Sequence, residues 1–512
     1  MVSKSGNWSD RIGRGRFLGL SGMSVAAIAM ASAGLSESKA IARPVFQEDP
    51  FGLGVASGDP LPGGVVLWTR LAPEPGSEDG RGGMPDRKVP VRWEVAEDEG
   101  FRKVVSRGTE VATPELGHSV HAEVEGLRPF REYYYRFKVG GETSPVGRTK
   151  TAPEPGAALD SLSFALGSCQ AWVGGRYAAY RDMAEQDLDL VLHVGDYIYE
   201  GADTRSLSDF RNLHALYKTS PDLQAAHAAF PFVVAFDDHE VDNNWADDAP
   251  QDDTPNFLQL RANAFQAYYE HMPLRMRQRP KGPDMLLYRR LAYGRLAEFN
   301  VLDTRQYRDD QLSDAFPGGP QQPGVFDPSR TFTGREQERW LLRNLDRSEA
   351  RWNVLTQQTM MAQYDYDTGE GVSVNHDQWD GYAAQRDRLL GFIGRRRLSN
   401  PMVLTGDWHV SMVNDVRSDF SDPDSEVVAT EFLGDSISSG AGWAADMEAA
   451  RDENPHVRFL EGTLKGYLLS TVTPDEWRSD FRVVADPADP ASPARTLSSW
   501  VVEDGTPGAQ RV

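Results

Sequence analysis

From residue 160 onward, short apolar runs alternate with longer amphipathic stretches, and this alternation limits the possible folds more than any other feature of the sequence. Apolar runs of strand length lie at 162–166, 188–194, 232–236, 296–302, 352–355 and 401–404. Stretches with helical periodicity lie at 176–185, 257–269 and 333–345. Thr333 and Glu336 have the spacing of a capping box, which predicts that the last of these helices begins there. Buried-type strands that alternate with helices predict an α/β layer architecture.

The segment before residue 150 has a different pattern, in which short strand-like runs are separated by Pro and Gly turns without helical stretches. This pattern predicts a small all-β sandwich at 45–150, and the run Glu132–Phe137 resembles the later strands of fibronectin type III modules. Residues 151–156 have the composition of a linker. We therefore expect an α/β domain at 157–485 and a C-terminal extension at 486–512.

Charge and cysteine content exclude several classes of protein. The chain has 54 Lys and Arg against 76 Asp and Glu, a formal net charge of −22, which argues against a binding surface for nucleic acid or anionic lipid. The single cysteine excludes an intramolecular disulfide. The sequence leaves the oligomeric state open.

Residues 1–42 have the composition of an export signal. Basic residues precede an apolar, Ala- and Gly-rich run at 17–35, and small residues at 38–42 are typical of a cleavage site. The apolar run is too short and too rich in small residues to predict a stable membrane anchor. We expect the mature protein to be exported, either to the periplasm or as a secreted protein.

Polar residues follow five of the predicted strands directly. These clusters are Gly167–Gln170, Gly195–Glu200, Asp237–Trp245, Asp303–Arg305 and Gly406–His409. In α/β sheets, functional sites form outside the carboxyl ends of the strands. If these strands are neighbours, Asp196, Asp238 and Asp407 would repel one another, and multivalent cations would relieve that repulsion.

The residue types in these clusters predict more than one kind of metal. Asp and Asn oxygens suit hard cations, whereas His and a thiolate suit transition metals. Taken singly, Cys169 is typical of a small buried residue, Tyr199 of a core residue and Arg305 of an ion pair. The dense acidic run that contains His239 makes a functional site the better interpretation.

Together these motifs resemble the PhoD-type alkaline phosphatase/phosphodiesterase family, from about residue 45 to near the C-terminus. The matching motifs are Gly167–Gln170, Gly195–Glu200, Phe236–Asn244, Leu302–Tyr307 and Thr405–His409. The resemblance implies a two-sheet αββα metallophosphatase domain behind the N-terminal β-sandwich. It also implies a centre with one Fe³⁺ and two Ca²⁺ ions.

The resemblance also implies a role for each matched residue. Cys169 and Tyr199 would bind Fe³⁺, and Asp196 would bridge iron and calcium. Asp238 and Asn244 would bind calcium. The family pattern further implies that Asp407 and His409 complete the metal cluster, that His239 protonates the leaving oxygen or contacts phosphate, and that Arg305 holds the non-bridging phosphate oxygens.

The expected reaction is hydrolysis of small phosphate esters by a metal-bound hydroxide or oxide. If five ligands are ionised, a site with two divalent ions keeps a negative net charge. One Fe³⁺ and two Ca²⁺ ions would instead give the site a positive net charge, which attracts phosphate. One alternative is a phospholipase D-like phosphodiesterase, and another is an exported module that binds glycans or surfaces.

The expected metal centre also affects which export route we predict. The segment Arg14–Leu18 resembles a twin-arginine signal, but Gly15 occupies the place of the second arginine. We favour the Tat route over Sec, because a protein that folds around metals gains from loading them before export.

Overall fold

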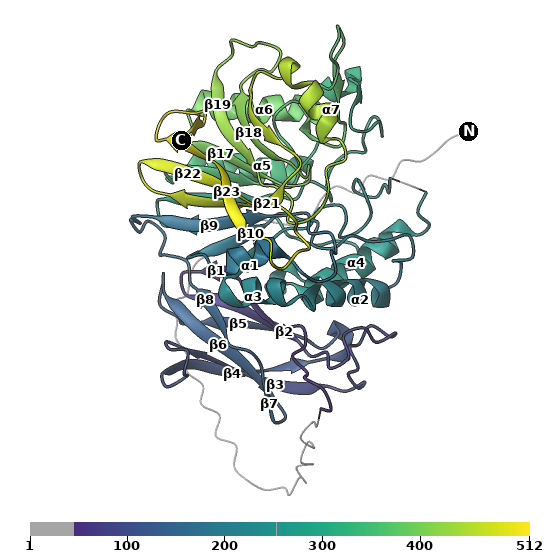
Figure 1. The fold of residues 1–512 in the computed structure, drawn as a ribbon, viewed down its shortest axis with the longest axis vertical. Coiled ribbons are helices and arrows are strands. Elements are labelled where there is room, and N and C mark those ends of the chain that lie inside the picture. The colour runs from purple at the N-terminus through teal and green to yellow at the C-terminus, as the bar shows by residue number, and fades with distance from the viewer. Residues whose placement is uncertain (1–45, 252) are drawn as a thin grey trace, which may run out of the picture. The chain divides into compact units, whose positions relative to one another are not determined.

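Two large β-sheets form the centre of the fold in the computed structural model, which describes residues 46–251 and 253–512 (Figure 1). Within these residues the larger sheet has ten strands, in the order β24 (Gln510–Arg511), β23 (Ala494–Glu503), β22 (Glu476–Val484), β21 (Lys465–Val472), β9 (Leu162–Gly167), β10 (Leu190–His193), β11 (Pro231–Val234), β1 (Val55–Leu61), β2 (Gly64–Arg70) and β5 (Ser119–Glu125). The second sheet, counted over the same residues, has seven, in the order β12 (Arg289–Tyr293), β13 (Ala297–Val301), β15 (Trp352–Thr356), β17 (Pro401–Thr405), β19 (Val427–Leu433), β18 (Ser411–Arg417) and β20 (Val457–Glu461).

The two sheets pack against each other through large aromatic side chains. Phe164 on β9 meets Phe299 on β13 with ring centroids 5.4 Å apart, and Trp477 on β22 meets Trp352 on β15 at 5.7 Å. All four rings belong to one buried hydrophobic cluster. Aromatic pairs of this kind bury much apolar area and also fix the relative orientation of their rings.

Helices add outer layers to these sheets. Their bounds are α1 (Ala178–Ala184), α2 (Leu207–Lys218), α3 (Pro221–Ala229), α4 (Phe257–His271), α5 (Gly334–Arg347), α6 (Ala383–Arg396) and α7 (Ala444–Ala449). Side chains of α1 to α4 join the hydrophobic cluster of the ten-stranded sheet, and side chains of α5 and α6 pack on β15 and β17. The predicted mixed α/β fold is confirmed, and so are the predicted helices that correspond to α1, α4 and α5.

The first strands of the chain are divided between two sheets. A separate five-stranded sheet contains β4 (Val104–Ala112), β3 (Val89–Ala96), β6 (Glu132–Val139), β7 (Glu142–Thr143) and β8 (Gly147–Lys150). In contrast, β1, β2 and β5 extend the ten-stranded sheet, because β1 pairs in parallel with β11. This pairing covers the free edge of β11. The likeness to a fibronectin type III sandwich stays a prediction.

The end of the chain also belongs to the large sheet. Within the predicted extension 486–512, β23 pairs with β22 along most of its length, and β24 pairs with β23. Figure 1 shows these last strands, in yellow, in the same sheet as β9, to which β21 connects them. Hydrogen bonding of the sheet therefore continues across both boundaries that the sequence predicted, at 150 and at 485.

The predicted capping box at Thr333 is wrong. Helix α5 begins after Thr333, but the Thr333 side chain makes no capping hydrogen bond and instead accepts one from Gln385 Nε2 at 2.8 Å. A contact with α6 therefore replaces the local cap. A true capping box lies at Ser206 and Asp209, at the start of α2.

Two further points concern the N-terminus and membranes. The predicted export signal at 1–42 lies outside the described residues. Among the residues that are described, none of the helices combines the length and the apolar character needed to cross a membrane.

The pairing of β1 with β11 can be tested at Gly58, because a Cβ there would lie 2.6 Å from the carbonyl oxygens of Phe232 and Pro273. We expect Gly58→Ala to destabilise the protein by about 1–3 kcal/mol, since backbone must shift to relieve the overlap. Thermal unfolding measures the effect. Gly63→Ala, where a Cβ meets nothing within 4 Å, is the matched control, and equal midpoints for the two variants would contradict the pairing.

Candidate metal centre

The five predicted polar clusters meet at the carboxyl ends of the strands. Strands β9, β10 and β11 of one sheet and β13 and β17 of the other each lead into one cluster. Hydrogen bonds join the clusters directly: Cys169 N donates to Gly195 O at 3.1 Å, and Arg305 Nη2 donates to Asp407 Oδ1 at 3.3 Å. The structure therefore brings the five predicted clusters together at one place.

A cavity of about 340 Å³ opens at this meeting point. Of the predicted site residues, it is lined by Asp196, Asp238, His239, Asn244, Asp407 and His409. The other three, Cys169, Tyr199 and Arg305, lie behind this lining. The volume is at the lower end of the range for pockets that hold small organic ligands.

Several of these residues have an unusual backbone conformation. Positive φ angles occur at Cys169 (56°), Asp196 (54°), Asn244 (51°), Asp407 (59°) and His409 (54°). Left-handed conformations are uncommon for residues other than glycine and cluster at functional sites. The backbone conformation of the turns that follow β9, β10 and β17 therefore costs free energy locally, and the surrounding structure must hold these turns in place.

One group of candidate ligands combines sulfur, oxygen and nitrogen. The ligand atoms of Cys169, Asp196 and His409 all lie within 4.8 Å of one another. Tyr199 Oη lies between two of them, 2.9 Å from Asp196 Oδ2 and 2.9 Å from His409 Nε2. His409 Nδ1 donates to the Gly440 carbonyl at 2.9 Å, which turns Nε2 toward this group.

A second group consists of carboxylates. Oxygen atoms of Asp196, Asp237, Asp238 and Asp407 also lie within 4.8 Å of one another. Asp196 Oδ1, Asp237 Oδ2 and Asp238 Oδ1 are buried and have no hydrogen-bond partner among the described residues. Buried carboxylate oxygens without partners are costly unless they bind cations. The donor set therefore fits metal ions, and Asp196, which belongs to both groups, is placed to bridge them.

Burial and mutual repulsion raise the pKa values of several of these groups. Burial raises the pKa of Asp407 to about 7, although Arg305 opposes this rise. Burial and the charge of Asp196 raise the pKa of the Cys169 thiol and of the Tyr199 phenol. Asp238 behaves differently: burial would raise its pKa, but the charges of Arg305 and His239 lower it overall. A bound cation would displace the proton from those groups whose pKa is raised.

His239 is held so that it keeps a proton. Its Nδ1 donates to Glu200 Oε2 at 2.9 Å, and Glu200 Oε1 accepts the Asn243 amide proton at 3.0 Å. Burial lowers the pKa of His239, but the charges of Asp238 and Asp196 and the bond to Glu200 raise it well above its usual value overall. A protonated imidazole that lines the cavity can donate a hydrogen bond or a proton.

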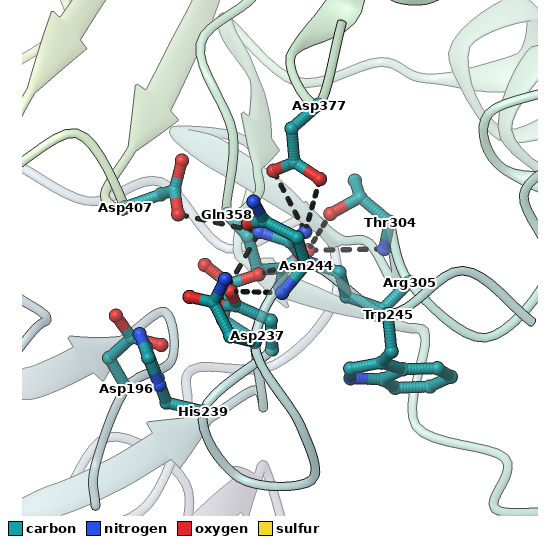
Figure 2. Close-up of polar contacts among 12 residues, drawn as sticks. Asp196, Asp237, His239, Asn244, Trp245, Thr304, Arg305, Gln358, Asp377 and Asp407 are labelled. Carbon is teal, nitrogen blue, oxygen red and sulfur yellow. Dashed lines mark hydrogen bonds and ion pairs between the residues drawn. The ribbon is translucent and has the colours of Figure 1, made fainter. Parts of the chain in front are cut away.

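Arg305 lies beneath the carboxylates instead of facing the cavity. Its side chain is fully buried, and Figure 2 shows the carboxylates of Asp237, Asp377 and Asp407 gathered around it. Both oxygens of Asp377 accept from Arg305 Nη1 at 2.9 Å, and Nε contacts Asp237. This geometry makes Arg305 a counter-charge for the acidic cluster. It gives no support to the predicted contact with phosphate oxygens.

The sequence assigned no role to some residues that the structure brings into the site. These are Asp237, Asp377, Gln378, Glu200 and Glu240. Gln378 Nε2 donates to Asp407 Oδ2 at 2.5 Å, and the carboxylate of Glu240 accepts from three backbone amides, those of Asp196, Tyr197 and Asp237. Asp237 and Glu240 belong to the acidic run that the sequence analysis identified, so their position in that run was the available signal. No strand-end pattern marks Asp377.

The whole chain is similar to proteins of one family. The family model described as PhoD-like phosphatase matches residues 164–481, and the model of its N-terminal domain matches residues 36–153. Alkaline phosphatase D of Bacillus subtilis (strain 168) is 47% identical over 523 aligned positions, which cover 98% of this chain and 88% of that protein. A solved structure of PhoD superposes with a TM-score of 0.88 at 49% identity and covers 92% of this chain and 93% of that one.

The buried position of Arg305 leads to a test of its role. Arg305→Gln leaves the carboxylates of Asp237 and Asp377 without their main counter-charge, so we expect a loss of about 3–5 kcal/mol of stability. Urea unfolding of the chelator-treated variants measures it. Arg396→Gln is the control, because the side chains of Arg396 and of its ion-pair partner Asp346 are 53% and 46% exposed; its loss should stay below about 1 kcal/mol. Similar midpoints for both variants would contradict the proposed counter-charge.

The raised pKa of Asp407, about 7, predicts how metal affinity depends on pH. Because the cation must displace the proton on this carboxyl, affinity for Ca²⁺ should rise as the pH increases from about 6 to about 8, and protons should be released on binding. Calorimetric titration of Ca²⁺ into chelator-treated protein, in buffers of different ionisation enthalpy, measures both quantities. Asp407→Asn should show a shallower dependence. An affinity that does not change with pH would refute this prediction.

Proposed function

The chain belongs to the PhoD-like phosphatase family, and from this membership and the geometry of its site we propose that it is an exported, metal-dependent phosphoric ester hydrolase. The observation that carries the proposal is the group of buried carboxylates around Asp196, three of whose oxygens have no hydrogen-bond partner among the described residues. Asp196, Asp238 and Asp407 of this group line a cavity large enough for a small phosphate ester.

We propose that the two ligand groups hold different ions. Cys169 and Tyr199 provide soft and phenolic donors for one Fe³⁺, with Asp196 and His409 beside them. Asp238 and Asn244 provide oxygen donors that suit Ca²⁺, and Asp407 completes the acidic group. When bound, these ions supply positive charge toward the phosphate and lower the pKa of the attacking water.

Residues of the chain itself carry out the proton transfer and position the ligands. Protonated His239, oriented by Glu200, donates its proton to the leaving alcohol oxygen. Arg305 binds the carboxylates of Asp237 and Asp377 and holds them in place, which also fixes their neighbours. Gln378 orients Asp407. No serine nucleophile is needed for this chemistry.

The alternative of a phospholipase D-like phosphodiesterase shares the same site. Of the described residues that line the cavity, none is Lys or Arg, so the bound ions, with His239, must balance the charge of the phosphate group. A diester carries one negative charge fewer than a doubly ionised monoester, and this favours diesters as the better substrates. A purely binding module, the third alternative, does not account for the buried carboxylates.

Export to the periplasm or beyond, through the Tat route, remains part of the proposal. It rests on the sequence of residues 1–42. Fractionation of cells that express the chain, followed by N-terminal sequencing of the exported product, tests it. An uncleaved product in the cytoplasm would refute this part.

Hydrolysis of a chromogenic monoester and of a chromogenic diester, assayed side by side at alkaline pH, tests the activity. A calcium-selective chelator should abolish the hydrolysis, and added Ca²⁺ should restore it. Asp238→Asn should lower kcat/KM by at least about a hundredfold, because losing a metal ligand removes several kcal/mol of transition-state stabilisation. Asp310→Asn, outside the set of cavity-lining residues, is the control. Full activity after exhaustive calcium removal would rule out the calcium sites.

The proposed iron site can be tested by colour, because thiolate and phenolate ligands donate charge to Fe³⁺ in the visible range. We expect purified protein to be coloured, and Tyr199→Phe to bleach or shift its absorption band. Cys169→Ser should weaken iron retention, because a hydroxyl is a harder and less acidic ligand. Elemental analysis of the same samples supplies the control. Colourless wild-type protein with zinc or manganese in place of iron would defeat the iron assignment and leave the hydrolase proposal intact.

A further inference from the structure

Three aromatic side chains form one side of the cavity, and neither the metal ligands nor the proposed chemistry uses them. They are Phe316, Trp408 and Trp443, here called the aromatic wall. Their rings contact one another, with centroids 5.8 Å apart for Phe316 and Trp408, 5.0 Å for Phe316 and Trp443, and 5.4 Å for Trp408 and Trp443. Three segments of the chain contribute, so the wall is a product of the fold.

The exposure and packing of the aromatic wall indicate a binding surface. Phe316 is 55% exposed, although the exposure of a phenylalanine ring to water is unfavourable. Trp408 is only 4% exposed and packs against both other rings. An exposed aromatic ring that is supported by two others beside a cavity is typical of a surface that a ligand completes.

The wall is attached directly to the metal centre. Trp408 lies between Asp407 and His409 in the chain, and the Trp443 ring lies over the His409 imidazole with centroids 5.2 Å apart. Asn375 Nδ2 donates to the Pro317 carbonyl at 2.8 Å, which ties down the loop that carries Phe316. A group that stacks on the wall is therefore held at a fixed position relative to the candidate metal ligands.

The rest of the cavity lining selects against charge. It contains the amides of Asn243, Asn244, Gln251 and Gln311, and no Lys or Arg among the described residues. Asp314, two residues before Phe316, lines the same cavity and is exposed. A substituent with a negative charge of its own would be repelled by this carboxylate, and the described lining offers no Lys or Arg to pair with it.

We propose that the aromatic wall binds a substituent of the phosphate ester through a flat, uncharged ring face, and that Asp314 disfavours substituents that carry additional negative charge. This inference rests on the proposed function, because it assigns a substrate class to the same site. The ring stacks on Phe316 and Trp443. Esters of uncharged ring alcohols are then preferred over esters of short open-chain alcohols and over esters with anionic substituents.

Phosphonates test the proposal without bond cleavage, so that binding of the substituent is separated from leaving-group chemistry. Inhibition constants for phenyl-, cyclohexyl- and methylphosphonate are measured on the metal-loaded protein with a small chromogenic diester as the reporter. We expect phenylphosphonate to bind about tenfold more tightly than methylphosphonate, as stacking on two rings predicts. The cyclohexyl compound distinguishes stacking of a flat aromatic ring from apolar contact with a puckered ring of similar size.

Variants of the wall make the test specific. Phe316→Ala should reduce the preference for the phenyl compound to within about threefold, and Phe316→Tyr should retain it. Phe326→Ala is the matched control, because Phe326 is 54% exposed but is not among the cavity-lining residues; it should leave the preference unchanged. Asp314→Asn should improve binding of 4-carboxyphenylphosphonate severalfold and leave phenylphosphonate unaffected. Circular dichroism verifies that each variant is folded.

The outcomes separate the two proposals. If the protein hydrolyses the reporter and the three phosphonates with uncharged substituents bind equally, the aromatic wall is not a substrate site and the hydrolase proposal stands. The inference is also overturned if the preference for phenylphosphonate survives Phe316→Ala. If neither ester is hydrolysed and methylphosphonate does not bind by calorimetry, the proposed function fails, and the wall fails with it.

Discussion

Repulsion among buried carboxylates is the constraint on which the rest of the site depends. Asp196, Asp237, Asp238 and Asp407 bring their oxygens within 4.8 Å of one another, an arrangement that is unfavourable in a buried environment unless positive charge is present. Arg305 supplies one such charge from below, and three carboxylate oxygens still have no hydrogen-bond partner among the described residues. The protein thus supplies part of the counter-charge itself, and in the proposed metal centre cations would supply the remainder.

The fold holds this unfavourable cluster in place from both sheets. The loops that carry Cys169 and Asp196 follow strands of the ten-stranded sheet, and the loops that carry Arg305 and Asp407 follow strands of the seven-stranded one. Because large aromatic side chains fix the sheets against each other, the carboxylates cannot move apart to relieve their repulsion. At Gly195, with φ 115°, a Cβ would lie 2.3 Å from Asp237 Cβ, so only glycine allows the two loops this close approach.

The electrostatics of the centre also explain how a strongly acidic protein can act on an anionic substrate. The chain carries a net charge of −22, and no Lys or Arg is found among the described residues that line the cavity. In the proposed mechanism, attraction of phosphate is therefore local and comes from bound cations together with His239. The proposed role of the aromatic wall fits this arrangement, because the cations would hold the phosphate and the uncharged surface would recognise its substituent.

The sequence by itself determined the strands, the polar residues at their ends and the metal-binding chemistry of those residues. These properties are local, because strand periodicity and ligand type are set by neighbouring residues. Only the tertiary structure decided which charges face one another. It placed Arg305 under the acids instead of at the cavity, brought in Asp377 from a segment without a strand-end pattern, and replaced the predicted cap at Thr333 with a contact to Gln385. It also paired β1 with β11 and continued the sheet across the predicted boundaries. Each of these contacts joins residues distant in the chain, and their partners are fixed by packing between elements that no local pattern specifies.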